Sequence, residues 1–246
     1  MATPAELYAA ILADPDDLDL RRRYADAIEA TDPDHAELIR IDLARSRPDR
    51  ASALRYRRVI PRLAGPVAHL LVDWKVRNGL VELVTMTARA FVDHGAEVWA
   101  QLPVRHLTLV EAAGLMPEVA GVASLGRLVA LDLSNNPIGD DGLAALAGSP
   151  YLGRLRWLGL ANCGIGPAGA EALAASRNLP DLRYVELWGN PVEVTAKGVG
   201  QDIDGKPMWV EMPPLGRELD ERYGPLPWLD IRWGWRLLGV ARWDEV

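Results

Sequence analysis

Hydrophobic positions recur with a fixed period through the middle of the chain. Residues 128–138 carry leucines in the spacing L-x-x-L-x-L, then an asparagine three residues later and a closing isoleucine. The same spacing returns at residues 155–165 and at residues 182–192, each time 27 residues further along. A constant period of this length is typical of stacked repeats, in which each repeat buries its apolar side against its neighbours. An earlier run at Val104, Leu107 and Leu109 fits a first, less regular repeat.

Each regular repeat combines a strand pattern with a helix pattern. Alternation predicts that Leu131 and Leu133 point into a core while the residues between them point outward. The amide of Asn136 is expected to bond backbone groups left unpaired where the strand ends. Small-residue stretches at 138–147 and 165–174 predict helices, with Asp140 as an N-cap and Pro167 in the first turn.

This spacing resembles the leucine-rich repeat of the ribonuclease-inhibitor-like class. The resemblance implies an α/β fold in which a parallel sheet forms the concave side of a solenoid and helices form the convex side. In the second repeat Cys163 replaces the asparagine, and it is the single cysteine of the chain. We expect a buried structural thiol there, because no histidine or basic residue lies beside it in the sequence.

The first 64 residues predict four short helices. Thr3 followed by Pro4 is typical of an N-cap with proline at the first helical position. Asp34 is expected to cap the third helix, and Leu54 is expected to point inward from the fourth. The carboxylates at positions 14, 16, 17 and 19 lack the glycine and closing glutamate of a calcium loop, so capping explains them better than a metal.

Three motifs within residues 4–46 resemble one family. They are Ile-Leu-Ala-Asp-Pro-Asp-Asp at 11–17, Tyr-Ala-Asp at 24–26 and Ala-Glu-Leu-Ile-Arg at 36–40. Together they resemble the repeat-companion domain that precedes leucine-rich repeats in planctomycete and myxobacterial proteins. Alanine stands at position 27, where that family commonly has tryptophan. The resemblance implies a helical fold and brings no enzymatic activity.

The pattern therefore divides the chain into four parts. Residues 1–64 form the helical domain, and residues 65–103 form a transition with a strand at 80–86 and a helix at 90–100. Residues 104–192 hold the repeats, and residues 193–246 hold a β-hairpin, a helix at 217–223 and a tryptophan-rich end. Five of the nine tryptophans lie after residue 200. They are expected to cap the repeats, with an exposed aromatic anchor for a partner as the alternative.

Composition narrows the classes of function. The net charge is −7, and 13 basic and 13 acidic residues balance within positions 1–78, so the excess of acid lies in the second part. This balance argues against a nucleic-acid partner. The basic clusters at 21–23 and 55–58 are expected to be solvated helix faces with acidic partners. We expect a cytoplasmic protein without a membrane partner, since neither a signal peptide nor a membrane span is evident. No metal or cofactor motif is present, and no pattern fixes an oligomeric state.

The outward strand positions predict the binding site. They place large aromatic side chains toward the last repeat and acidic side chains beside them. The hypothesis is a protein or peptide partner bound at these positions. The predicted contact residues are His106, Thr108, Asp132, Ser134, Trp157, Tyr184, Glu186 and Trp188. One alternative is that the C-terminal hairpin folds over these rings. A second is an assembly subunit held through the helical domain and the aromatic end.

Catalysis receives little support from the sequence. There is no phosphate-binding loop, metal-binding histidine pair or nucleophile elbow. A hydrolase triad can be drawn through His106, Asp132 and Ser134, but an open sheet offers these groups neither a pocket nor an oxyanion hole. The chain is therefore predicted not to be an enzyme.

Overall fold

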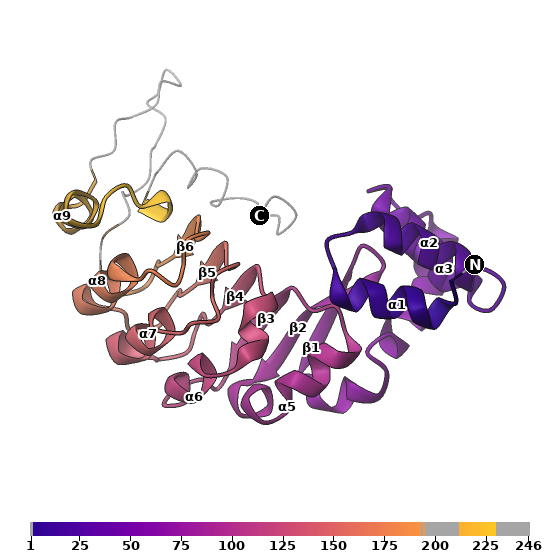
Figure 1. Ribbon diagram of the computed structural model, residues 1–246, viewed down its shortest axis with the longest axis horizontal. Coiled ribbons are helices and arrows are strands. Elements are labelled where there is room, and N and C mark those ends of the chain that lie inside the picture. Colours follow the sequence, from indigo (N-terminus) through magenta and orange to yellow (C-terminus); the bar gives the residue numbers. More distant parts are fainter. Residues whose placement is uncertain (1, 193, 195–211, 230–246) are drawn as a thin grey trace, which may run out of the picture. The chain divides into compact units, whose positions relative to one another are not determined.

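The computed structural model describes residues 2–192, 194 and 212–229. The chain divides into two compact units, Met1–Thr108 and Leu109–Val246. Its strands follow one another as β1-β2-β3-β4-β5-β6, and β3 (His106–Val110) contributes residues to both units (Figure 1). Among the described residues, no helix is long and apolar enough to cross a membrane.

Four helices open unit 1, as the sequence predicts. They are α1 (Pro4–Ala13), α2 (Leu18–Ile28), α3 (Pro33–Leu43) and α4 (Arg50–Val59), followed by the 3-10 turns η1 (Ile60–Arg62) and η2 (Gly65–Leu70). Thr3 and Glu6 form a reciprocal capping box on α1, and Asp17 caps α2 through two backbone amides. The predicted cap Asp34 is wrong. Asp32 caps α3 instead, because its carboxylate accepts the His35 amide hydrogen at 3.3 Å.

The inward prediction for Leu54 is also wrong. Its side chain is 55% exposed, because Ser52, Tyr56 and Val59 form the buried face of α4. These three residues are spaced by four and three positions and so share one side of the helix. Leu54 falls on the opposite side.

A β-hairpin and a helix complete unit 1. Strand β1 (Asp73–Arg77) pairs antiparallel with β2 (Leu80–Thr87) across Asn78 and Gly79, whose φ angles are 51° and 77°. Two positive φ angles in an Asn-Gly loop are typical of a type I′ turn. The strand expected at 80–86 is therefore confirmed, and β1 is a partner that the sequence did not reveal. Helix α5 (Ala88–Gln101) follows, with Thr87 as its N-cap.

Unit 2 alternates short strands and helices. Parallel strands β4 (Ala130–Asp132), β5 (Trp157–Gly159) and β6 (Tyr184–Glu186) pair in order. Helix α6 (Met116–Ala120) and the turn η3 (Ala123–Arg127) precede β4, and helices α7 (Gly139–Ala147) and α8 (Pro167–Ala175) lie between the strands in sequence. Leu131, Leu158 and Val185 occupy one register and are buried, which confirms the expected inward leucine positions.

The asparagine position performs its predicted role. The Asn136 amide nitrogen donates to the carbonyls of Leu109 and Leu133 at 2.9 and 2.8 Å, and its oxygen accepts the Ala112 amide hydrogen at 2.8 Å. Asn190 repeats this pattern one interval beyond Cys163. Cys163 itself is buried, and burial raises the pKa of its thiol to about 11, as expected for a structural cysteine.

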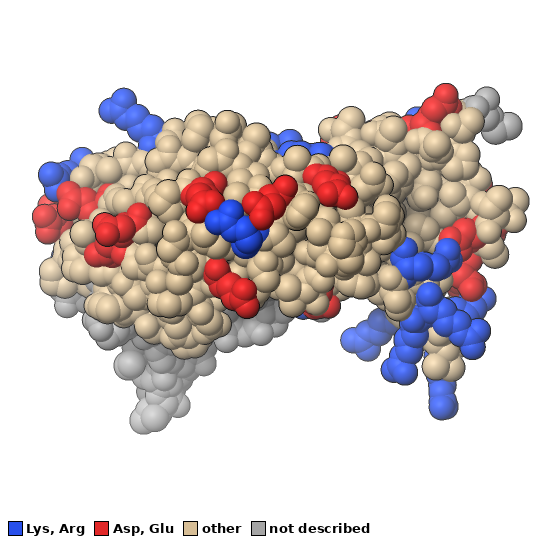
Figure 2. Space-filling view, turned by 90° about the horizontal axis from the view of Figure 1, so that it is seen from below, with Lys and Arg blue, Asp and Glu red and all other residues tan. Residues whose placement is uncertain are grey.

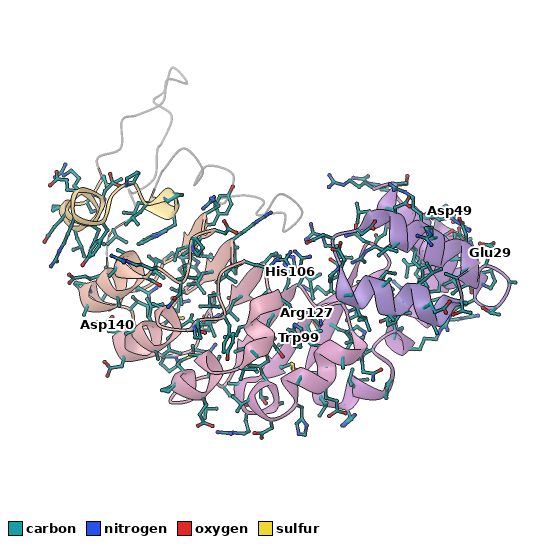
Figure 3. The ribbon with its side chains drawn as sticks, viewed as in Figure 1. Glu29, Asp49, Trp99, His106, Arg127 and Asp140 are labelled. Atoms are coloured by element: carbon teal, nitrogen blue, oxygen red, sulfur yellow. The ribbon has the colours of Figure 1, made fainter. Side chains whose placement is uncertain are left out.

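Asp140 does not cap its own helix. The N-cap position of α7 is Ile138, which makes no side-chain cap. Asp140 (labelled in Figure 3) instead accepts the amide hydrogen of Gly166, the N-cap residue of α8, at 2.6 Å. A β-carbon at Gly166 or Gly169 would overlap this carboxylate, so the two glycines make room for a bond between neighbouring repeats.

Part of the C-terminal region packs on the repeats. Helix α9 (Pro214–Tyr223) begins three residues before the predicted start at 217 and contacts α8, where the Tyr223 hydroxyl donates to Glu171 at 3.0 Å. The turn η4 (Pro227–Leu229) contacts β6, and Trp228 is buried. The strands predicted around 192–196 and 208–212 lie largely outside the described residues, as do Trp209, Trp233, Trp235 and Trp243.

Candidate binding surface

The predicted outward positions of unit 2 align across three parallel strands. Ala130, Trp157 and Tyr184 share one register, and Asp132, Gly159 and Glu186 share the next. We call the outward positions of these repeats the outer strand face. It comprises residues 130, 132, 134, 157, 159, 161, 184, 186 and 188.

Trp157 does not face solvent as the sequence predicted. Its exposed fraction is 3%, and the far edge of its indole lies over Gly159 on its own strand. A β-carbon at Gly159 would overlap the far edge of this ring and the Asp132 carboxylate. The absence of a side chain at position 159 therefore lets the large ring lie down across the sheet.

Replacing Gly159 with alanine should destabilise the protein by about 1–3 kcal/mol, since the new methyl group must displace Trp157 or Asp132. Gly153→Ala is the matched control, because nothing lies within 4 Å of a β-carbon there. Urea unfolding of both variants measures the difference. Equal stabilities would contradict the packing of Trp157 over Gly159.

Trp188 is the large aromatic group that stays open on the outer strand face. Its side chain is 63% exposed, and its indole nitrogen donates to the Glu186 carboxylate at 2.7 Å. This bond orients the ring, and it leaves the rest of the Glu186 carboxylate available to a partner. Tyr184 is half-buried two residues before Glu186.

Two carboxylates flank the covered centre of this face. Asp132 and Glu186 lie in one register on either side of Gly159, so their backbones are about 10 Å apart at the usual strand spacing. Asp132 also accepts the Ser134 amide hydrogen at 2.9 Å, and the Ser134 hydroxyl accepts that of Ala161 at 3.3 Å. The face thus combines fixed negative charge with open aromatic surface.

The two remaining predicted contact residues, His106 and Thr108, belong to unit 1. His106 is 5% exposed, which contradicts its expected place on an open face, and Thr108 is half-buried. The Arg77 guanidinium donates to His106 Nε2 at 3.0 Å. Burial and the positive charges of Arg77 and Arg105 lower the pKa of His106 to about 3. A histidine in this state is a poor general base, so the triad loses its proton acceptor.

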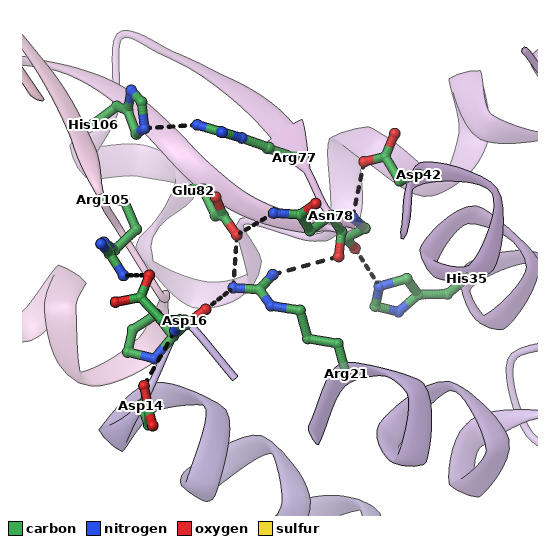
Figure 4. A network of polar contacts seen from close by, with 12 residues as sticks. Asp14, Asp16, Arg21, His35, Asp42, Arg77, Asn78, Glu82, Arg105 and His106 are labelled. Carbon is green, nitrogen blue, oxygen red and sulfur yellow. Dashed lines mark hydrogen bonds and ion pairs between the residues drawn. The ribbon is translucent and has the colours of Figure 1, made fainter. Parts of the chain in front are cut away.

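Unit 1 contains a buried polar network that the sequence did not predict (Figure 4). Arg21 lies fully buried between helix α2 and the hairpin, and its guanidinium pairs with Glu82 at 2.6 Å. The same guanidinium donates to the Pro15 carbonyl at 2.7 Å and to the Asn78 carbonyl at 3.4 Å. The reading of residues 21–23 as a solvated face is therefore wrong for Arg21, because its partner lies 61 residues away in the sequence.

The tip of the hairpin is held by helix α3. His35 Nε2 contacts the Gly79 carbonyl at 2.9 Å, and Asp42 accepts the Gly79 amide hydrogen at 2.9 Å (Figure 4). A β-carbon at Gly79 would overlap Ile39, so only glycine allows this approach. These contacts and Arg21 together fix the hairpin to the helices within unit 1.

The acidic run at 14–19 is used by the protein itself. Asp14 accepts the Asp16 amide hydrogen, Asp16 pairs with Arg105, and Asp17 caps α2. Within the described residues, no group of three or more metal-ligating side chains is assembled.

The periodic leucines, the inward asparagines and the parallel register together describe one repeat type. Residues 128–147 and 155–174 match the Leucine Rich repeat family model. The match covers the two most regular repeats, including helices α7 and α8. Comparison with the curated proteins and with the solved structures gave no significant match. Leucine-rich repeats generally mediate interactions between proteins and are typically non-catalytic.

Proposed function

We propose that this protein is a non-catalytic binding module that captures a protein or peptide on its outer strand face, the concave side of a leucine-rich-repeat solenoid. The observation that carries the proposal is Trp188, an open indole held in place by Glu186. A rigid exposed aromatic group beside a carboxylate is the kind of residue that dominates protein interfaces.

The charge of this face favours a basic partner. Asp132 and Glu186 stand on both sides of the ring of Trp157, and Tyr184 and Trp188 add aromatic surface. An arginine or lysine side chain bound here would meet a carboxylate and the face of a ring together. Trp157 contributes by filling the centre, while Ser134 offers a hydroxyl group at the margin.

The experiment begins with the partner that full-length protein retains from cells of its source organism. Trp188→Ala should weaken binding of that partner by at least about tenfold, because a buried aromatic anchor contributes about 2 kcal/mol or more. Glu186→Gln should also weaken the binding of a basic partner. The matched control is Tyr151→Ala, since Tyr151 is another exposed aromatic residue of unit 2 that lies off this face. Calorimetric titration measures all three, and an unchanged affinity for Trp188→Ala would contradict the proposal.

Two further expectations belong to this proposal. We assign residues 4–46 to the repeat-companion family, and the capped helices α1 to α3 support this assignment. We also propose that the chain has four parts, with boundaries after residues 64, 103 and 192. The C-terminal region is assigned as a cap, supported by the burial of Trp228 and Leu229. Assembly through the helical domain is a second candidate function, and the exposed arginines near α4 favour it.

A further inference from the structure

Helix α4 and the connection before it carry five arginines that form no ion pair with a described residue. Arg45, Arg47, Arg50, Arg57 and Arg58 are all exposed, and no described carboxylate forms an ion pair with them. Figure 2 shows Lys and Arg side chains gathered around the helical part of unit 1. Three of the five, Arg50, Arg57 and Arg58, lie on one side of α4, and we call these three the arginine face. The expectation that the cluster at 55–58 has acidic partners is therefore wrong for Arg57 and Arg58.

Two other arginines of the same segment do form ion pairs with carboxylates of unit 1. Arg55 contacts Glu37 at 2.6 Å, and Arg62 contacts Asp32 at 2.6 Å. The acidic residue nearest to the arginine face in sequence is Asp49, and its carboxylate is occupied as the N-cap of α4, accepting the Ser52 amide hydrogen at 2.7 Å. The carboxylates that pair with this segment are thus directed to Arg55 and Arg62, and no described carboxylate forms an ion pair with the arginine face.

Leu54 stands among these charges. Positions 50, 54, 57 and 58 follow the i, i+4, i+7, i+8 spacing that places residues on one side of a helix, over about 12 Å of its length. Leu54 is 55% exposed there, with the exposed Ala51 and Ala53 on either side of the stripe. The surface therefore offers several guanidinium groups arranged around one apolar side chain.

We propose that the arginine face and Leu54 form a second docking surface, whose occupant is an acidic protein segment that carries an apolar residue among its Asp and Glu side chains. Charge complementarity is the main argument, because guanidinium groups pair with carboxylates in planar, two-bond contacts. Leu54 supplies the second argument, since an acidic peptide can present apolar and charged side chains side by side.

Other anionic partners fit this surface less well. A phosphate backbone would pair with the arginines but would leave Leu54 without an apolar counterpart. An anionic membrane would attract the arginines, yet stable insertion of a helix needs a broader apolar side than one leucine and two alanines. These two classes are therefore outcomes of the test that would overturn the proposal.

The test uses the full-length chain and three fluorescent probes: a peptide of repeated Glu-Glu-Leu units, a single-stranded oligonucleotide of equal charge, and phosphatidylserine vesicles. The peptide should bind most tightly, and binding should weaken as salt is raised. The triple variant Arg50→Gln, Arg57→Gln, Arg58→Gln should weaken peptide binding by about tenfold, because three exposed charge pairs together contribute on the order of 1–2 kcal/mol. Leu54→Ser should weaken it about threefold.

The matched control is Arg22→Gln with Arg23→Gln, which removes two exposed arginines of α2 and should change affinity less than twofold. Because all these positions are exposed, circular dichroism is expected to show unchanged helicity. The proposal is overturned if the triple variant binds the peptide like the wild type, if Leu54→Ser has no effect, or if the oligonucleotide or the vesicles bind more tightly. Peptide binding that is lost equally in the α2 control would also overturn it.

Discussion

Replacing Arg21 with alanine is expected to destabilise unit 1 by about 3–5 kcal/mol. The substitution leaves the Glu82 carboxylate buried without its cationic partner, and burial already raises the pKa of Glu82. The carbonyls of Pro15 and Asn78 lose a donor at the same time. Urea unfolding followed by circular dichroism measures the loss in the free energy of unfolding.

Arg22→Ala is the matched control for this prediction. Arg22 is the next residue on α2, is exposed, and lies 3.7 Å from an exposed Asp19, so its loss should change stability by no more than about 0.5 kcal/mol. The double variant Arg21→Met with Glu82→Leu should recover most of the stability, because it removes both buried charges. An Arg21→Ala variant as stable as the Arg22→Ala variant would show that the buried pair does not hold the hairpin.

Replacing Asn136 with alanine is expected to destabilise unit 2 by about 2–4 kcal/mol. The substitution removes the side-chain partner of the Ala112 amide and of the Leu109 carbonyl, and each unsatisfied buried group costs about 1–3 kcal/mol. The Leu133 carbonyl loses one donor and keeps the backbone amide of residue 136 and the Cys163 thiol. Thermal and urea unfolding of the purified variant measure this loss.

Asn190→Ala provides the comparison, because Asn190 makes the same set of bonds in a later repeat but is half-buried. Water can replace part of its bonding, so the loss of stability should be smaller than for Asn136→Ala. If both variants were as stable as the wild type, the asparagine side chains would not stabilise the protein through their hydrogen bonds to the backbone at the strand ends.

The repeat could be predicted from the sequence because its determinants are local and periodic. The interval of 27 residues between Leu131 and Leu158 is also the register of β4 on β5, and the same interval relates Leu158 to Val185. Each leucine therefore predicts its neighbour in the sheet without knowledge of any distant contact. The same reasoning placed Asp132 and Glu186 in one register.

Features that depend on neighbours outside the period were not predictable. Trp157 follows the outward pattern, yet it is buried, and the space above Gly159 accommodates the edge of its ring. Arg21 belongs to a run of three arginines that looks uniformly solvated, yet Glu82 and the hairpin enclose one of them. Leu54 is the opposite example, an apolar residue expected inside that is exposed. The spacing of Ser52, Tyr56 and Val59 places the buried face on the other side of α4.

The central claim is that the partner binds on the outer strand face, and site-specific photocrosslinking tests it most directly. A photoreactive aromatic amino acid is placed at Tyr184, which leaves the Trp188 anchor intact, and in a separate variant at Ala144, which is exposed on helix α7 away from the strands. The account predicts that the partner purified with the wild-type chain crosslinks at position 184 and not at position 144. Crosslinking at position 144 alone would contradict it.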